Sequence, residues 1–304
     1  MEVSVLEGKL KAAAIPYRVQ EPMRDHTSFC IGGPADLYVT PDSVEKLRTC
    51  VSLCREAGVP YVLIGNGSNL VFADEGYRGA VIGTSLLAGA PTLVSETEVR
   101  CPAGAKLATL CSFACDNALS GVECLWGIPG SVGGAVCMNA GAYGGEVKDT
   151  LVSCTCLTPE GEIQTYSAGD LYLSYRHSRF SDSGEIVLDA TFRLAPAPQE
   201  EIRAKMNDLM GRRREKQPLE YPSAGSVFKR PQGYYAAALI DGCGLKGACV
   251  GGIQVSEKHA GFMINTGGGT CADLKRLIDR VKREVYAAHG VELECEIRMI
   301  GEAE

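Results

Sequence analysis

The segment from Gly127 to Gly141, GIPGSVGGAVCMNAG, constrains the fold of this chain most, because it places five glycines among small side chains. With so little side-chain bulk, an aromatic ring system or a phosphate chain can lie directly against the backbone. Such a segment is typical of a loop that holds a flat or an anionic ligand, although it could also be a tight structural turn.

A second glycine-rich loop, IGNGSNL, runs from Ile64 to Leu70 directly after a short apolar segment. Its glycines allow sharp turns that expose successive N–H groups, and its Asn and Ser residues add side-chain donors, so the loop can hold a pyrophosphate. One such loop alone could equally be a structural turn. Two of them with these polar residues favour a site for a nucleotide or a flavin.

The composition is that of a globular protein. The chain has 304 residues, 45% hydrophobic and 22% charged, which is enough for two or three domains. Its net charge of −7 argues against a general nucleic-acid or membrane-surface binder. No apolar run reaches the ~20 residues that a membrane span needs, and the start, MEVSVLEGKLKAAAIPYR, lacks the continuous apolar core of a signal peptide. We therefore expect a cytoplasmic protein with no nucleic-acid or membrane partner.

Fourteen cysteines are scattered along the chain without any C-x-x-C pair. On a helix, Cys50 and Cys54 would share a buried face with Leu47 and Val51. We expect most of the cysteines to be reduced core residues in a reducing compartment. The four histidines lie far apart and form no ligand-spaced pair, so no metal is predicted.

Hydrophobic periodicity predicts three regions, at residues 1–80, 81–197 and 198–304. The first begins with a short helix at 4–14. It continues as strand, helix and strand over 35–65, with Pro41 in the first turn of the helix.

The second region alternates strand patterns with one clear helix. The helix is expected at 107–118, and the segments 150–157 and 162–166 read as a hairpin. A further strand is predicted at 185–194, and the Ala-Pro-Ala-Pro segment at 195–198 reads as a linker.

The third region begins with a polar helix whose end, Arg212 to Arg214, we interpret as a solvated face given the overall charge. A strongly periodic helix follows at 274–285. The last predicted strand alternates strictly, so that Leu293, Cys295, Ile297 and Met299 face one side, and Glu294, Glu296 and Arg298 face the other.

The segment GCGLKG at 242–247 satisfies the G-x-G-x-x-G dinucleotide fingerprint. That motif carries meaning only after a strand and before a helix. Here it follows AAALI at 236–240, which reads as helical, so Gly242 or Gly244 is expected to end that helix. A Rossmann fold is therefore not supported.

Three further positions offer polar groups for chemistry. Arg176, beside Tyr175, is a natural fork for a carboxylate. Ser226 follows a glycine but lacks the G-x-S-x-G elbow of hydrolases, and Glu296 lies on the polar face of the last strand. Read singly, these are a surface arginine, a turn serine and a solvated glutamate. The residues alone indicate a nucleotide- or flavin-binding α+β protein.

Seven segments together resemble the UDP-N-acetylenolpyruvoylglucosamine reductase family, and they run in the family's order from about residue 26 to residue 301: HTSFCIGGPAD, IGNGSNL, LSGVECLWGIPGSVGGAVCMNAGAYGGE, LSYRHS, PSAGSVFKRP, GGIQVSEKHAGFMIN and LECEIRMIG. Several are long and chemically unusual. The chain is similar to the shorter type of this family, which lacks a tyrosine-bearing insertion, because little separates SYRHSRF from EIVLDATFRL.

The resemblance implies an α+β fold in which the first two regions form a two-part FAD-binding module of the vanillyl-alcohol-oxidase type. The third region would be an α/β substrate-binding domain. It also implies a cytoplasmic, monomeric oxidoreductase with non-covalent FAD and NADPH as electron donor. Its substrate would be a UDP-sugar: UDP-N-acetylglucosamine enolpyruvate would be reduced to UDP-N-acetylmuramate. This step belongs to peptidoglycan precursor synthesis, and so to cell-wall biogenesis, cell shape, the cell cycle and cell division.

The resemblance gives catalytic roles to the three polar positions. Hydride addition to the terminal carbon of the enolpyruvyl group develops negative charge on its carboxylate as an enolate. Arg176 and Glu296 match the family's enolate-stabilising pair, the arginine by its charge and the glutamate if it is protonated or relays a proton. Ser226 matches the general acid that protonates the neighbouring carbon, a role that is plausible for a serine in a dry, preorganised site.

The same match assigns binding residues. The expected substrate contacts are Tyr175, Lys216, Gln254 and Arg298. The expected FAD contacts lie mostly in the two glycine-rich loops: Ile64, Gly65, Asn66, Gly67, Ser68, Asn69, Leu70, Ile128, Pro129, Gly130, Ser131, Gly133, Gly134, Ala135, Asn139, Gly141 and Val187. The chain departs from the family at Cys295, where proline is usual, but this residue is predicted to face away from Glu296.

Two alternatives stay open at this point. One is an FAD-dependent oxidase of the same superfamily, many of which attach FAD covalently; the segments with Ser226 and Glu296 favour the reductase. The other is a non-enzymatic module that senses UDP-sugars. Binding alone does not need Arg176, Ser226 and Glu296 together, which argues against it.

Overall fold

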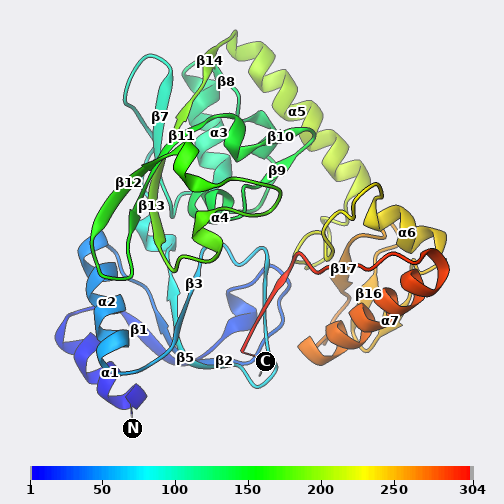
Figure 1. Cartoon of the computed structure of the whole chain (residues 1–304), viewed down its shortest axis with the longest axis horizontal. Coiled ribbons are helices and arrows are strands. Elements are labelled where there is room, and N and C mark those ends of the chain that lie inside the picture. Colours follow the sequence, from blue (N-terminus) through cyan, green and yellow to red (C-terminus); the bar gives the residue numbers. More distant parts are fainter. Residues whose placement is uncertain (1, 302–304) are drawn as a thin grey trace. The chain divides into compact units, whose positions relative to one another are not determined.

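The computed structural model describes residues 2–301, which fall into two units built from interleaved stretches of the chain (Figure 1). Unit 1 comprises the chain up to residue 18, then 38–66 and 80–213. Unit 2 comprises 19–37, 67–79 and the chain from 214 onward. The boundary passes through strands β1 (Tyr17–Pro22), β2 (Pro34–Val39) and β5 (Tyr77–Gly83), which belong to a four-stranded sheet of order β1-β2-β5-β3.

The first helices of unit 1 follow the predicted pattern closely. Helix α1 (Glu2–Ala12) buries Leu6 and Leu10. Helix α2 (Val44–Glu56) buries Leu47, Cys50, Val51 and Cys54, so the predicted buried face is confirmed. The predicted start at Pro41 is wrong: Ser43 has extended backbone and its hydroxyl accepts a hydrogen bond from the Lys46 N–H at 3.2 Å, so the helix begins after it.

Strand β3 (Tyr61–Ile64) leads into the first glycine-rich loop and pairs in parallel with β5. Its apolar residues and the glycine that follows were the signal for this strand, and the prediction is confirmed.

A five-stranded antiparallel sheet of order β12-β11-β13-β7-β6 forms the centre of unit 1. Its strands are β6 (Thr92–Leu93), β7 (Glu98–Pro102), β11 (Leu151–Leu157), β12 (Ile163–Ser167) and β13 (Ile186–Arg193). The predicted hairpin and the strand after it are confirmed. Helices α3 (Leu107–Asp116) and α4 (Val132–Cys137) contribute to a buried core with the sheet residues Cys101, Cys154 and Ala190.

The predicted linker at 195–198 is wrong in its first half. Ala195 and Pro196 form strand β14, which pairs antiparallel with β8 (Leu119–Ser120). Proline is tolerated there because the pairing is only two residues long, as on the edge of a sheet. The remaining short elements of unit 1 are β9 (Gly141–Ala142), β10 (Gly145–Glu146) and the 3₁₀ turns Ser85–Leu87, Glu123–Leu125, Val147–Asp149, Ala168–Leu171 and Arg179–Ser181.

The polar helix α5 (Gln199–Lys216) buries only Ile202 and Met206 and carries a largely charged surface. The interpretation of Arg212 to Arg214 as one solvated face is wrong for its middle member. The Nε atom of Arg213 is buried, whereas Arg212 and Arg214 are exposed. A helix turns by about 100° per residue, so three consecutive arginines cannot all face solvent alike.

Unit 2 packs two helices on a small antiparallel sheet of order β15-β16-β17. The elements are α6 (Ala236–Gly242), β15 (Cys249–Val250), β16 (Ile253–Val255), β17 (Met263–Asn265) and α7 (Cys271–His289). In Figure 1, α7 in orange to red lies beside β16, and its apolar stripe of Leu274, Leu277, Ile278, Val281 and Val285 is buried. A 3₁₀ turn at Met23–Asp25 also belongs to this unit.

The end of helix α6 confirms that the G-x-G-x-x-G match is not a dinucleotide fingerprint. The helix stops at Gly242, and Gly244 has a left-handed φ of +67°. Helix α6, and not a strand, leads directly into the motif, so the glycines serve to end a helix.

The last strand is shorter than predicted. Only Arg298–Ile300 forms a strand, β18, which pairs in parallel with β4 (Leu70–Phe72). The predicted alternation still holds, because Leu293 and Ile297 are buried in the core of unit 2 and Cys295 and Met299 pack against it. Cys295 therefore faces away from Glu296 in the way that the pattern predicted.

Candidate active site

The start of the first glycine-rich loop, at Gly65 and Asn66, meets the second loop within unit 1. The side-chain amide of Asn66 donates to the carbonyl of Pro129 at 3.3 Å. Gly65 lies so near Ser131 that a Cβ on the glycine would stand 2.3 Å from the serine Oγ. Ser131 itself caps helix α4, since its Oγ accepts a hydrogen bond from the N–H of Gly134. The residues at this junction can therefore act on one ligand.

The first loop has the donors that an anionic ligand needs. Among the described residues, 2–301, no hydrogen-bond partner occurs for the backbone N–H groups of Gly65, Asn66, Gly67 and Ser68. Gly67 has φ +61°, and a Cβ there would lie 2.1 Å from the carbonyl oxygen of His26, so only glycine fits this turn. A run of unused N–H groups on a glycine turn fits the chemistry of a pyrophosphate.

Asn139 holds the second loop in place. Its side chain is buried, and its Nδ2 donates to Glu146 Oε2 at 3.0 Å and to the Ser174 carbonyl at 2.9 Å. Its Oδ1 accepts from the N–H of Lys148 at 2.9 Å. Both amide protons of Asn139 are thus used within the protein, so the residue orders the loop. Val187 likewise places its side chain in the buried core of unit 1.

Arg176 lies at the end of the second loop. Its Nη2 donates to the carbonyl of Gly141 at 3.3 Å, and its guanidinium lies 5.1 Å from the ring centre of Tyr175. The backbone of Arg176 has φ +56°, which is uncommon for a residue other than glycine. Such conformations concentrate at functional sites because the surrounding structure has to impose them. Here a tight turn closed by Ser174 and His177 does so.

In unit 2, Ser226 and Glu296 come together on neighbouring segments. The N–H of Glu296 donates to the carbonyl of Val227 at 2.8 Å. On the other side, the N–H of Val227 donates to the carbonyl of Gly261, and Ser226 forms a bridge with Phe262. The half-buried Ser226 hydroxyl makes no hydrogen bond to any other residue in the described range of 2–301.

The expected substrate contacts are spread over both units. Tyr175 belongs to unit 1 and is 44% exposed. Gln254 lies on β16 with its amide donating to the Gly247 carbonyl at 3.3 Å, Arg298 begins β18, and the exposed Lys216 ends α5, all three in unit 2. The structure thus brings Ser226 near Glu296 within one unit, while Arg176 belongs to the other.

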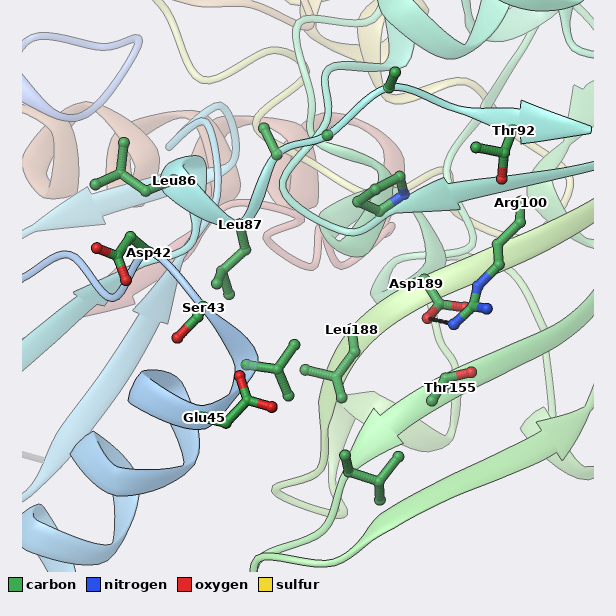
Figure 2. Close-up of a pocket in the computed structure, with 16 residues that line it drawn as sticks. Asp42, Ser43, Glu45, Leu86, Leu87, Thr92, Arg100, Thr155, Leu188 and Asp189 are labelled. Atoms are coloured by element: carbon green, nitrogen blue, oxygen red, sulfur yellow. Dashed lines mark hydrogen bonds and ion pairs between the residues drawn. The ribbon is translucent and has the colours of Figure 1, made fainter.

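A pocket of about 630 Å³ in unit 1 contains none of these residues (Figure 2). It lies between the start of α2, at Asp42 to Glu45, the loop around Leu87, and the sheet face that carries Asp189. Asp189 is paired with Arg100 at 2.6 Å, so its charge is already balanced. This pocket is separate from the junction of the glycine-rich loops.

More than half of the cysteines lie in the buried core, in line with the expected core packing. Eight of the fourteen are buried, and all fourteen are free thiols. Burial raises the pKa of the Cys101 thiol to about 12, so it stays protonated and unreactive near neutral pH. Across residues 2–301, no three potential metal ligands from His, Cys, Asp or Glu gather at one place. None of the helices described there is long and apolar enough to cross a bilayer.

Comparison with known proteins gives consistent matches over both parts of the chain. Residues 35–167 match the family described as "FAD binding domain". Residues 217–300 match "UDP-N-acetylenolpyruvoylglucosamine reductase, C-terminal domain". The mixed α and β structure with an FAD-binding module and a C-terminal domain is thereby confirmed.

Individual relatives match almost end to end. The UDP-N-acetylenolpyruvoylglucosamine reductase of Agathobacter rectalis is 49% identical over 293 residues, which is 93% of each chain. That of Clostridium botulinum is 47% identical over 284 residues, 93% of this chain and 92% of the relative. The crystal structure of the reductase from Thermus caldophilus superimposes with a TM-score of 0.80 at 34% identity, covering 94% of this chain and 98% of the other.

Proposed function

Because the chain belongs to the UDP-N-acetylenolpyruvoylglucosamine reductase family, we propose that Arg176, Ser226 and Glu296 take the catalytic roles of that reaction. The chain is an FAD-dependent oxidoreductase. It reduces UDP-N-acetylglucosamine enolpyruvate to UDP-N-acetylmuramate, a peptidoglycan precursor, with electrons from NADPH. The relatives are named as reductases, and they match this chain over nearly their whole length. Neither the oxidase nor the sensor alternative is therefore needed.

FAD, when bound, supplies the electron transfer from NADPH to the enolpyruvyl double bond. We assign its pyrophosphate to the junction of the two glycine-rich loops, at Gly65, Asn66, Gly130 and Ser131. The unused N–H groups of the first loop and the hydrogen bond from Asn66 to Pro129 support this assignment. The absence of an attachment motif in these loops favours non-covalent binding. The other expected FAD contacts, and the division at residues 80 and 197, stay predictions.

Each proposed catalytic residue has a separate role in the reduction of the substrate. Arg176 is placed to stabilise the negative charge that develops on the substrate carboxylate, because an arginine supplies a permanent charge and a fork of donors. Ser226 delivers a proton to the carbon beside the one that receives hydride. Glu296 supports the enolate as a proton donor or relay.

A single observation carries this assignment: Ser226 and Glu296 lie on segments joined by the 2.8 Å hydrogen bond from the Glu296 N–H to the Val227 carbonyl. A serine and a carboxyl group held on adjacent, hydrogen-bonded segments lie close enough to act on one reacting group. Proximity of this kind is what a proton-transfer step needs.

The family also suggests how the enzyme works in the cell. We propose that it acts in the cytoplasm as a monomer and, through the peptidoglycan precursor, in cell-wall biogenesis, cell shape and cell division. Free, mostly buried cysteines support a reducing compartment. Size-exclusion chromatography with light scattering tests the monomer directly.

The absorption spectrum of the purified protein tests the proposed function. We expect a yellow protein with one FAD per chain that denaturation releases. NADPH should bleach it, and the enolpyruvyl UDP-sugar should restore the colour under anaerobic conditions. A colourless protein that FAD does not reconstitute contradicts the proposal. Bleaching without recovery by the substrate contradicts the reductase assignment, and flavin that stays attached after denaturation contradicts non-covalent binding.

A further inference from the structure

Arg213 is the half-buried cation of helix α5, between the exposed Arg212 and Arg214, and it has no anionic partner among residues 2–301. Arg203, Lys205 and Arg212 pair with Asp116, Glu123 and Asp208 at 3.2, 3.1 and 2.8 Å. Arg213 makes no ion pair or hydrogen bond within residues 2–301, and its Nε atom is buried. The side chain is thus half-buried, and its Nε–H has no acceptor among these residues.

The side chain of Arg213 lies against the start of the second glycine-rich loop. A Cβ on Gly127 would stand 2.7 Å from Arg213 Cδ and 3.5 Å from its Nε. Gly127 therefore leaves the space that the arginine stem occupies. Tyr143 follows the other end of the loop. Its phenol raises the pKa of Arg213 and so favours the charged guanidinium. The guanidinium is thus held beside the loop that runs from Gly127 to Gly141.

Burial of this charge is unfavourable on its own. Burial lowers the pKa of Arg213, with the phenol of Tyr143 opposing the effect, yet a guanidinium stays protonated under ordinary conditions. A buried charge without a partner destabilises a protein, and charges of this kind are normally paired. The described part of the chain, residues 2–301, supplies no such partner for Arg213, which indicates a partner that arrives with a ligand.

We infer that Arg213 is an FAD-binding residue whose guanidinium pairs with an anionic group of the cofactor. Two parts of FAD offer that chemistry: the pyrophosphate, and the pyrimidine edge of the isoalloxazine ring, which becomes negative on reduction. The inference rests on the proposed function. The same loop carries Pro129 and Ser131, which meet Asn66 and Gly65 at the junction assigned to FAD, and all of these residues belong to unit 1.

The test compares Arg213→Met, which keeps the apolar stem, with Arg213→Lys, which keeps the charge. Arg212→Met, at the exposed neighbour paired with Asp208, is the matched control. FAD is titrated into the FAD-free full-length chain by flavin fluorescence, and the midpoint potential of bound FAD is measured by dye equilibration. The thermal midpoint of each FAD-free protein is also recorded.

If Arg213 pairs with the pyrophosphate, Arg213→Met weakens FAD binding by about 10-fold or more and leaves the potential unchanged, because a hydrogen bond to a charged group contributes on that scale. If it pairs with the reduced ring, the potential falls while the affinity for oxidised FAD stays near wild type. In both cases Arg213→Lys recovers part of the effect, Arg212→Met behaves as wild type, and the FAD-free Arg213→Met chain is at least as heat-stable as wild type.

Wild-type affinity and wild-type potential in Arg213→Met overturn the inference. A lowered thermal midpoint of the FAD-free variant with unchanged FAD binding also overturns it, since that is the result for a residue that only packs. These outcomes leave the proposed function intact. Failure of the wild-type chain itself to bind FAD would instead reject the proposed function.

Discussion

The side-chain amide of Asn69 donates a hydrogen bond to the backbone carbonyl of Glu296 at 3.1 Å, across a sequence separation of 227 residues. The carbonyl of Asn69 accepts in turn from the N–H of Arg298 at 3.0 Å. One residue later, Leu70 begins the strand that pairs with Arg298 in parallel. The end of the first glycine-rich loop and the segment of the proposed catalytic glutamate are thus one hydrogen-bonded structure within unit 2.

Asn69→Ala should lower the free energy of unfolding by about 0.5–1.5 kcal/mol, because it removes a side-chain hydrogen bond to the Glu296 carbonyl. Urea unfolding followed by circular dichroism measures the change. Asn66→Ala provides the comparison. The hydrogen bond from the Asn66 side-chain amide to the Pro129 carbonyl is exposed and should contribute less to stability. If Asn69→Ala and wild type have equal free energies of unfolding, this hydrogen bond does not contribute to stability.

Ser226→Ala should separate the two half-reactions. A residue that only protonates the substrate carbanion has no part in the reduction of FAD, so bleaching by NADPH should stay nearly normal. Reoxidation by the enolpyruvyl substrate should slow by at least ~10²-fold, the low end for loss of a positioned general acid. Stopped-flow absorbance measures both steps. Ser226→Cys should recover some activity, since a thiol can also give a proton.

Two other outcomes for Ser226→Ala carry different meanings. Equal slowing of both half-reactions indicates that Ser226 shapes the flavin pocket. Normal rates in both steps contradict the general-acid role and return Ser226 to an ordinary residue of a turn.

Gly65→Ala should disturb the junction of the glycine-rich loops, because its Cβ would stand 2.3 Å from Ser131 Oγ. We expect weaker FAD binding in a fluorescence titration. The double variant Gly65→Ala with Ser131→Ala removes the colliding oxygen and should bind FAD better than Gly65→Ala alone. Ser131→Ala by itself loses the cap of α4, a change of about 1 kcal/mol in stability. Strictly additive effects of the two substitutions contradict a direct contact.

His259 should make the stability of unit 2 sensitive to pH. Burial lowers the pKa of His259, and the charge of Lys246 lowers it further, against a backbone hydrogen bond of the residue itself that raises it. Its Nδ1 accepts from the N–H of Gly261 at 3.1 Å, which requires the neutral ring. As the pH falls below the ordinary histidine value of 6.5, the unfolded chain binds a proton before the native chain does, so the free energy of unfolding decreases.

Urea unfolding at about pH 7.5 and about pH 5 measures this dependence. His259→Asn keeps an oxygen that can accept from Gly261 and should flatten the dependence. His289→Asn, at the exposed end of α7, is the control and should leave it unchanged. A pH dependence that is identical in wild type and His259→Asn contradicts the assignment to His259.

Local sequence patterns predicted the structural features that depend only on residues close together in the chain. The apolar faces of α2 and α7, the hairpin of β11 and β12, and the end of α6 at Gly242 follow from periodicity and turn chemistry. The two loops were recognisable because glycine and small polar residues cluster in the sequence, and the structure joins them through Asn66 and Pro129.

Pairings between distant segments could not be predicted in that way. The carboxylate of Asp74 accepts from the N–H groups of Cys271 and Ala272 at 2.8 and 2.9 Å, and no local signal near Asp74 indicates a helix start 197 residues away. The buried Nε of Arg213 was missed for the same reason, because a run of arginines looks uniformly polar until the packing of Gly127 is known.

The interleaving of the two units has a consequence for how the chain is made. The segments of unit 1 are complete once residue 213 has left the ribosome, whereas unit 2 must wait for the chain from 214 onward. Until then Phe29, Ile31 and Val71, which are buried in the core of unit 2, have no partners to cover them. A nascent chain in this state exposes apolar surface for the whole time needed to synthesise its last third, so chaperone binding and sensitivity to C-terminal truncation should both be greatest during that interval.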